Sequence, residues 1–73
     1  MKEVNNHPFM DYRTVKAYET ANGGYVQVYD VRELNHGRYS VEKFDGRGGM
    51  ETIYGSRNLD KCIAYAMQYA KQN

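Results

Sequence analysis

The 73-residue chain has no tryptophan, one cysteine, one proline and no long apolar run. One cysteine cannot form an internal disulfide, which excludes a disulfide-stapled secreted scaffold and suits a reducing, cytoplasmic compartment. No stretch approaches the roughly 18 apolar residues that a membrane span needs. No charged-then-apolar leader opens the sequence, so we expect no signal peptide and no membrane partner.

The chain also lacks an excess of charge of either sign, because its formal net charge is +1. A dedicated nucleic-acid binder usually carries strong positive charge, so this balance disfavours that class. Hydrophobic residues make up 41% and charged residues 26% of the chain, which is typical of a folded domain and not of a disordered tail. A chain this short forms one domain with a small core.

Alternating β-branched and aromatic residues predict four short strands separated by glycine-containing turns. The clearest strand is Tyr25-Val26-Gln27-Val28-Tyr29-Asp30-Val31, and an Asn-Gly-Gly turn precedes it. The four predicted strands cover residues 13–20, 25–31, 38–44 and 50–54. Neighbouring strands joined by short turns form an antiparallel meander.

A helix is predicted from residue 59 to residue 72, because apolar residues recur there at helical spacing. Ser56 or Asn58 can cap its first amides, and Asp60 suits its positive end. The predicted fold is therefore α+β: a four-stranded antiparallel β-meander with one C-terminal helix packed on one face. Residues 1–12 are predicted to form an N-terminal arm and residues 13–73 a single domain. The alternative fold has a helix in place of the first strand.

Side chains able to carry chemistry are few and scattered. Cys62 falls on the apolar stripe of the helix, which predicts a buried thiol. His7 and His36 show no ligand spacing with each other or with the cysteine, so no metal is expected. The glycine-rich segment 45–49 lacks the pattern of a phosphate-binding loop and precedes a strand. We therefore expect no catalytic residues, no cofactor and no enzyme activity.

Tyrosine is the unusual component, with eight copies. Tyr25, Gln27 and Tyr29 share one face of their strand, and Val26 and Val28 share the other, because side chains alternate. If the valines meet the helix, the two tyrosines project from the uncovered face. That face must meet solvent, the arm or a partner. Tyrosine is favoured at interfaces but also suits half-buried strand positions, and both interpretations remain open.

Residues 13–72, with their glycine- and tyrosine-rich hairpins and amphipathic helix, resemble many small proteins encoded by phages and other mobile elements, including several anti-CRISPR proteins. The resemblance implies a non-enzymatic inhibitor that sterically blocks a host protein complex. We therefore expect a protein partner, or a homodimer formed through the same surface. The expected partner contacts are Tyr25, Gln27, Tyr29, His36, Arg47 and Arg57.

Residues 25–72 also resemble the double-stranded RNA-binding domain. In that comparison Asn35-His36-Gly37 would be the loop between the first two strands, and Arg57 and Lys61 would stand at the start of the last helix, where that family holds phosphates. Asn58 stands where a second basic residue is expected, and the family begins with a helix. This resemblance implies a small nucleic-acid-binding domain as the alternative function.

Overall fold

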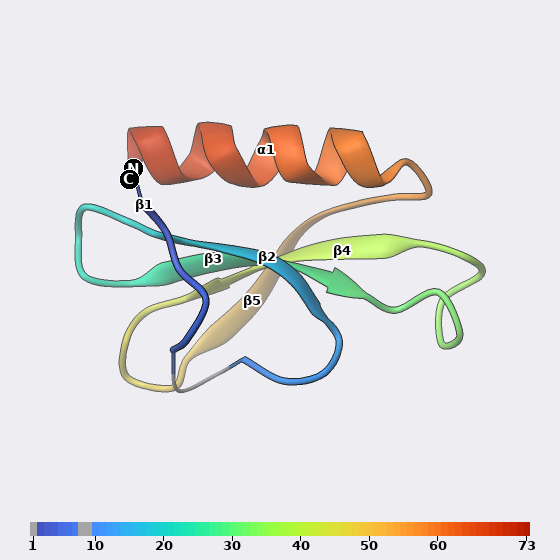
Figure 1. The fold of residues 1–73 in the computed structure, drawn as a ribbon, viewed down its shortest axis with the longest axis horizontal. Helices are drawn as coiled ribbons and strands as arrows, with labels where there is room; N and C mark the ends of the chain where they lie inside the picture. Colours follow the sequence, from blue (N-terminus) through green and yellow to red (C-terminus); the bar gives the residue numbers. More distant parts are fainter. Residues whose placement is uncertain (1, 8–9) are drawn as a thin grey trace.

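The computed structural model describes residues 2–7 and 10–73. Within these residues, five antiparallel strands form one sheet in chain order, and a helix lies across one face of the sheet (Figure 1). The elements are β1 (Lys2–Glu3), β2 (Thr14–Glu19), β3 (Tyr25–Asp30), β4 (Tyr39–Phe44), β5 (Met50–Ser56) and α1 (Leu59–Gln72). No helix in the described part of the chain is long and apolar enough to cross a membrane.

The predicted α+β meander with a C-terminal helix is confirmed, but the sheet has five strands and not four. The additional strand, β1, pairs Lys2 with Glu19 and Glu3 with Tyr18 at the outer edge of β2. A strand of two residues is too short to show alternation. The ion pair between Glu3 and Lys16, 3.3 Å apart, also joins β1 to β2. The alternative fold with a helix in place of the first predicted strand is wrong, because β2 occupies that segment.

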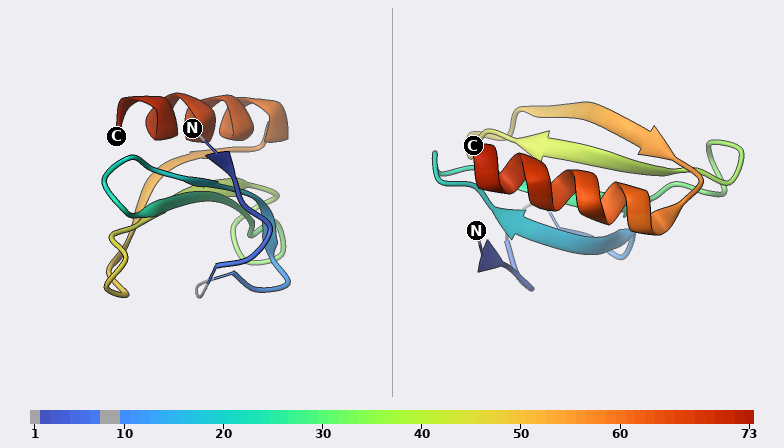
Figure 2. Two further views of the ribbon diagram at one scale, coloured as in Figure 1. Left: turned by 60° about the vertical axis from the view of Figure 1, so that its left-hand side comes forward. Right: turned by 90° about the horizontal axis from the view of Figure 1, so that it is seen from above.

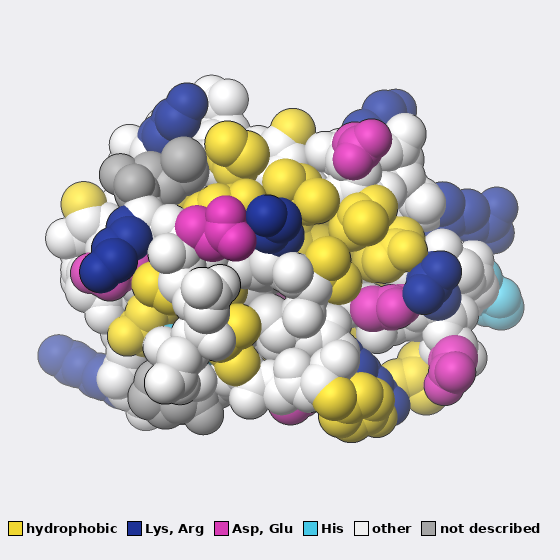
Figure 3. All heavy atoms as spheres, viewed as in Figure 1, with side chains coloured by type: hydrophobic (Ala, Val, Ile, Leu, Met, Phe, Trp, Pro, Cys, Tyr) yellow, Lys and Arg dark blue, Asp and Glu magenta, His cyan; other side chains and the backbone are white. Residues whose placement is uncertain are grey.

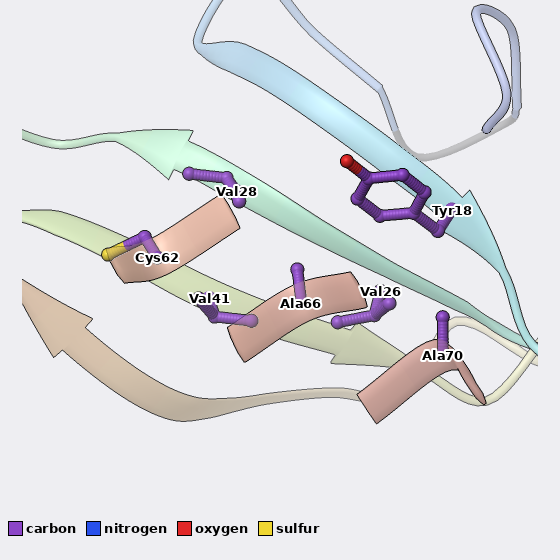
Figure 4. Packing of buried hydrophobic residues seen from close by; sticks show 7 residues of the cluster. All are labelled: Tyr18, Val26, Val28, Val41, Cys62, Ala66 and Ala70. Carbon is purple, nitrogen blue, oxygen red and sulfur yellow. The ribbon is translucent and has the colours of Figure 1, made fainter. Parts of the chain in front are cut away.

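The valines of β3 meet the helix, as the alternation predicts. Val26 and Val28 have no exposed surface, and Val28 lies opposite Val41 of β4 in the sheet register. Residues from the sheet and the helix complete the buried cluster in Figure 4: Tyr18, Val26, Val28, Val41, Cys62, Ala66 and Ala70. The helix contributes small side chains to this cluster, so its backbone can approach the sheet closely.

Both ends of α1 are capped. The Oδ1 atom of Asn58 accepts a hydrogen bond from the backbone N–H of Lys61, so Asn58 is the N-cap. At the other end, the N–H of Asn73 donates to the carbonyl of Tyr69. The carbonyl of Asn73 in turn accepts from the N–H of Asn22, 3.0 Å away. The helix is thereby tied to the β2–β3 turn as well as to the core.

The sheet bends away from the helix on both sides, so the face opposite α1 is concave (Figure 2). We call this the tyrosine face, because Tyr25 and Tyr29 of β3 lie on it. Gln27 lies between them, directly opposite Glu42 of β4. Described residues that precede β2 lie below this face in Figure 1. Because β1 pairs with β2, part of the predicted N-terminal arm belongs to the folded body; residues 1, 8 and 9 of the arm lie outside the described residues.

Candidate partner-binding surface

His7 covers the middle of the tyrosine face. Its ring is stacked on the ring of Tyr25, with centroids 4.4 Å apart and an interplanar angle of 11°. It also contacts Phe44 in a tilted arrangement at 5.9 Å. The Nε2 atom of His7 lies 3.1 Å from Oε1 of Gln27. Because Gln27 has no exposed surface, it cannot contact a partner directly while His7 is in place.

Gln27, which His7 contacts, pairs with Glu42 of β4, and both side chains are polar and buried. The carboxylate of Glu42 is buried and accepts a hydrogen bond from the hydroxyl of Thr52, at 2.7 and 3.0 Å from its two oxygens. The Nε2 atom of Gln27 is buried with no hydrogen-bond partner among the described residues. Burial lowers the pKa of His7, because a charged imidazolium loses its hydration there. This arrangement joins the N-terminal segment to the sheet and leaves Tyr25 half-buried.

Tyr29 is also engaged with the N-terminal segment. Its hydroxyl donates a hydrogen bond to Oδ2 of Asp11. Burial and the neighbouring carboxylate raise the pKa of Tyr29 to about 12, so the hydroxyl keeps its proton. Tyr25 and Tyr29 thus face away from the helix as predicted, but both contact the chain's own N-terminal segment. Whether either contacts a partner stays a prediction.

A second surface lies at the end of the sheet where β3 leads into the loop 31–38. Tyr12 is 87% exposed and Leu34 is 69% exposed. Both line one hollow of about 350 Å³, together with Arg13, Asp30, Val31, Arg32 and Glu33. Hydrophobic and basic side chains protrude side by side at the lower right of Figure 3, below the ends of β2 and β3. We call the two exposed apolar residues and this hollow the Tyr12–Leu34 surface.

Internal hydrogen bonds fix the loop that carries Leu34. The carbonyl of Val31 accepts from the N–H groups of Leu34 and Asn35, at 3.0 and 2.9 Å, and the N–H of Gly37 donates to the carbonyl of Arg32 at 3.0 Å. His36 adopts a left-handed conformation with φ of 52°, so the loop closes tightly. Leu34 is therefore held outward by the backbone and not by packing.

Two arginines frame the hollow. The guanidinium of Arg32 donates two hydrogen bonds of 2.9 Å to the carboxylate of Asp30 and lies 5.2 Å above the ring of Tyr39. The guanidinium of Arg13 lies 5.2 Å from the ring centre of Tyr12. Both contacts restrict long side chains that would otherwise be mobile, so less conformational entropy is lost when a partner binds.

The remaining predicted contacts divide between the two ends of β4. At the loop 31–38, Nε of Arg57 donates to the carbonyl of His36 at 3.1 Å, so these two residues lie together. Arg47 lies in the loop beyond the opposite end of β4, and its side chain is exposed. A single small contact area therefore cannot contain His36, Arg57 and Arg47 together.

The sequence analysis did not identify Tyr12 and Leu34 as contact residues. The one signal that could have identified them is a large apolar residue that stands alone within a polar turn.

Another hollow, of about 440 Å³, lies near the loop that carries Arg47. Its lining includes Tyr25, Tyr69 and Met50, and the ion pair between Lys43 and Glu51, whose atoms are 3.2 Å apart. This hollow connects the exposed side of Tyr25 to solvent. Its lining is mixed, with apolar and charged side chains.

The remaining candidates for a reactive or metal-binding role are Cys62 and the His, Asp and Glu side chains. Cys62 is fully buried, as predicted, and burial raises the pKa of its thiol. Within residues 2–7 and 10–73, no group of three or more His, Cys, Asp or Glu side chains is placed to hold a metal ion. Comparison with protein-family models, curated proteins and solved structures finds no match to this chain.

Proposed function

We propose that this chain is a non-enzymatic protein-binding module and that it binds its partner through the Tyr12–Leu34 surface. The observation that carries the proposal is the pairing of Tyr12 and Leu34, 87% and 69% exposed, around one hollow. Apolar side chains exposed to this extent cost hydration free energy in the isolated protein, and a partner that covers them recovers it.

The form of the surface also supports protein binding. Interface hot spots are enriched in tyrosine and arginine, and their energy is concentrated in a few central side chains. The hollow is of a size to receive one or two side chains of a partner, with Tyr12 and Leu34 on its walls and Arg13 and Arg32 at its rim. The internal hydrogen bonds of the loop hold Leu34 in position before binding.

The mode of action that we propose is steric occlusion in the cytoplasm. A domain of 8.5 kDa can cover a working surface of a larger host complex without performing chemistry on it. This is the action implied by the resemblance to small inhibitors encoded by phages and other mobile elements. His36 and Arg57, which lie together at the same end of β4, are the proposed peripheral contacts.

The test compares the tagged wild-type chain with Tyr12→Ala/Leu34→Ala in nuclease-treated lysate of the cell in which the chain acts. Captured proteins are quantified by mass spectrometry. We expect at least one protein to be retained by the wild type and reduced more than tenfold by the double variant. Met50→Ala is the matched control, because Met50 is 61% exposed but lies outside this surface. It should capture the same protein at the wild-type level.

Two outcomes would contradict the proposal. One is equal capture by the wild type and the double variant, which would place the contact elsewhere. The other is a signal that appears only in a parallel lysate from which the nuclease is omitted and that falls steeply as salt is raised, which is the behaviour of nucleic-acid binding. In a third case the chain forms a homodimer that buries Tyr12 and Leu34 against a second copy. Sedimentation of the purified chain identifies this case by the mass of a dimer in solution.

A further inference from the structure

The turn that presents Tyr12 is organised by the side chain of Asp11. Oδ1 of Asp11 accepts a hydrogen bond of 2.8 Å from the N–H of Arg13. The N–H of Asp11 donates to the hydroxyl of Thr14 at 3.2 Å, and the N–H of Thr14 donates back to the carbonyl of Asp11 at 3.0 Å. This is an Asx-type turn, in which a side-chain oxygen replaces a backbone acceptor.

The same carboxylate also joins the turn to the sheet. Its second oxygen, Oδ2, accepts from the hydroxyl of Tyr29 in β3. One oxygen of Asp11 therefore holds the turn closed and the other holds the turn on the sheet. Beyond Tyr12, the carbonyl of Arg13 accepts from the N–H of Asp30 at 2.9 Å, which fixes only the C-terminal side of the turn.

We infer that Tyr29 is a positioning residue, whose hydroxyl sets the Asp11 carboxylate and thereby holds Tyr12 beside Leu34. The value of that position for binding depends on the proposed function, but the positioning itself does not. Tyr12 is too exposed to be held by burial in the core, so the hydrogen bonds of its neighbours set the position of its backbone in the turn. Tyr29 would then affect partner binding without contacting the partner.

Tyr29→Phe is the direct test, because it removes the hydroxyl and keeps the ring. Trypsin cleavage after Arg13, under conditions where the chain is folded, reports opening of this turn. We expect the variant to be cleaved there several times faster than the wild type. Tyr25→Phe, on the same strand and face, is the matched control and should be cleaved at the wild-type rate. Equal rates for Tyr29→Phe and the wild type would overturn the inference.

Cleavage after Lys16, within β2, measures general loosening of the sheet. If cleavage after Lys16 rises in step with cleavage after Arg13, Tyr29 is only a stabilising residue and the inference fails. An NMR titration of the Asp11 carboxyl gives an independent measurement. The groups facing this carboxyl are Tyr29 and Arg13, and the tyrosine hydrogen bond is the largest cause of its lowered pKa. In Tyr29→Phe that pKa should rise toward its ordinary value.

The two proposals can fail separately. If Tyr29→Phe opens the turn and also weakens capture of the partner several-fold, both hold. If it opens the turn and capture is unchanged, the positioning holds and the proposed role of Tyr12 fails. If the turn stays closed, the positioning fails whatever happens to capture.

Discussion

The ring of His7 lies almost parallel to the ring of Tyr25, 4.4 Å away between centroids, on the side of the sheet that the helix leaves open. Through this contact, the N-terminal segment packs against the sheet. A single helix covers only one face of a sheet, and here His7 and Asp11 of the N-terminal segment contact the other face at Tyr25 and Tyr29. The second layer of this small domain is thus an aromatic and polar one, centred on His7 and Gln27.

Acidification should destabilise the domain through His7. Its pKa is lowered by burial, so at a pH below about 6.5 the unfolded chain binds more protons than the folded one. The free energy of unfolding is then highest above this value, and it falls as the pH drops toward the lower pKa of the folded state. Urea unfolding at pH 7.5 and at pH 5.5 measures the change.

His7→Phe is the control for this effect, because it keeps an aromatic ring over Tyr25 and removes the titrating group. The difference in stability between the two pH values should be smaller in the variant than in the wild type. If the wild type and His7→Phe lose equal stability on acidification, another group is responsible and His7 is not the acid-sensitive contact.

Substitutions on the two faces of β3 should differ in severity. Val28 has no exposed surface and lies under the helix, so Val28→Asp places a carboxylate in the apolar core and should cost about 4 kcal/mol or more. That is comparable to the whole stability of a domain of this size. Tyr25→Ala removes a half-buried ring and should cost less than the roughly 3–5 kcal/mol of a core aromatic.

Thermal unfolding of both variants checks the difference. Val28→Asp should show no cooperative transition, and Tyr25→Ala should unfold cooperatively at a reduced midpoint. In Tyr25→Ala, amide exchange should also become faster around His7, since its stacking partner is gone. A folded Val28→Asp together with an unfolded Tyr25→Ala would contradict the assignment of the two faces.

The sequence predicts the meander and the helix well, because their signals are local. Alternation in the segment around Val26 and Val28 distinguishes the core face, and the Asn-Gly-Gly turn before Tyr25 marks the hairpin. The helix bounds follow from apolar spacing, and the sequence limits the N-cap to Ser56 or Asn58, of which the structure uses Asn58. β1 could not be predicted, because two residues are too few to show an alternating pattern.

The environment of individual polar residues could not be predicted from the chain. Gln27 alternates with valines and so belongs to the far face, but its contacts there, with His7, 20 residues away in sequence, and with Thr14, cannot be read from alternation. Likewise, Leu34 has no periodic neighbours, so its exposure depends on the fold of its loop. A contact with a sequence-distant residue contributes to the first case, and hydrogen bonds within the loop 31–38 decide the second. Alternation carries no information about either.

Two glycines should respond differently to alanine. A Cβ added to Gly24 would collide with the backbone carbonyl of Phe44 on the neighbouring strand, which cannot move without breaking the β3–β4 ladder. Gly48 has open space around it but a φ of 93°, which disfavours any residue with a Cβ. We expect Gly48→Ala to cost about 1 kcal/mol and Gly24→Ala clearly more. Urea unfolding of both variants measures this, and an equal cost would contradict the steric account.

Cys62 should be nearly unreactive in the folded chain. Its thiol has no exposed surface, burial raises its pKa, and its sulfur lies 3.7 Å from the carbonyl of Tyr39 and 3.8 Å from that of Ser56. The reactive thiolate is therefore both scarce and inaccessible. A small aromatic disulfide reagent at pH 8 should react with the native chain only as fast as the domain opens, and it should react rapidly in urea.

Cys62→Ala should fold with a modest loss of stability, because it removes one buried sulfur. Fast labelling without denaturant would mean that the end of α1 near Cys62 opens independently of the core, and it would contradict the packing described here.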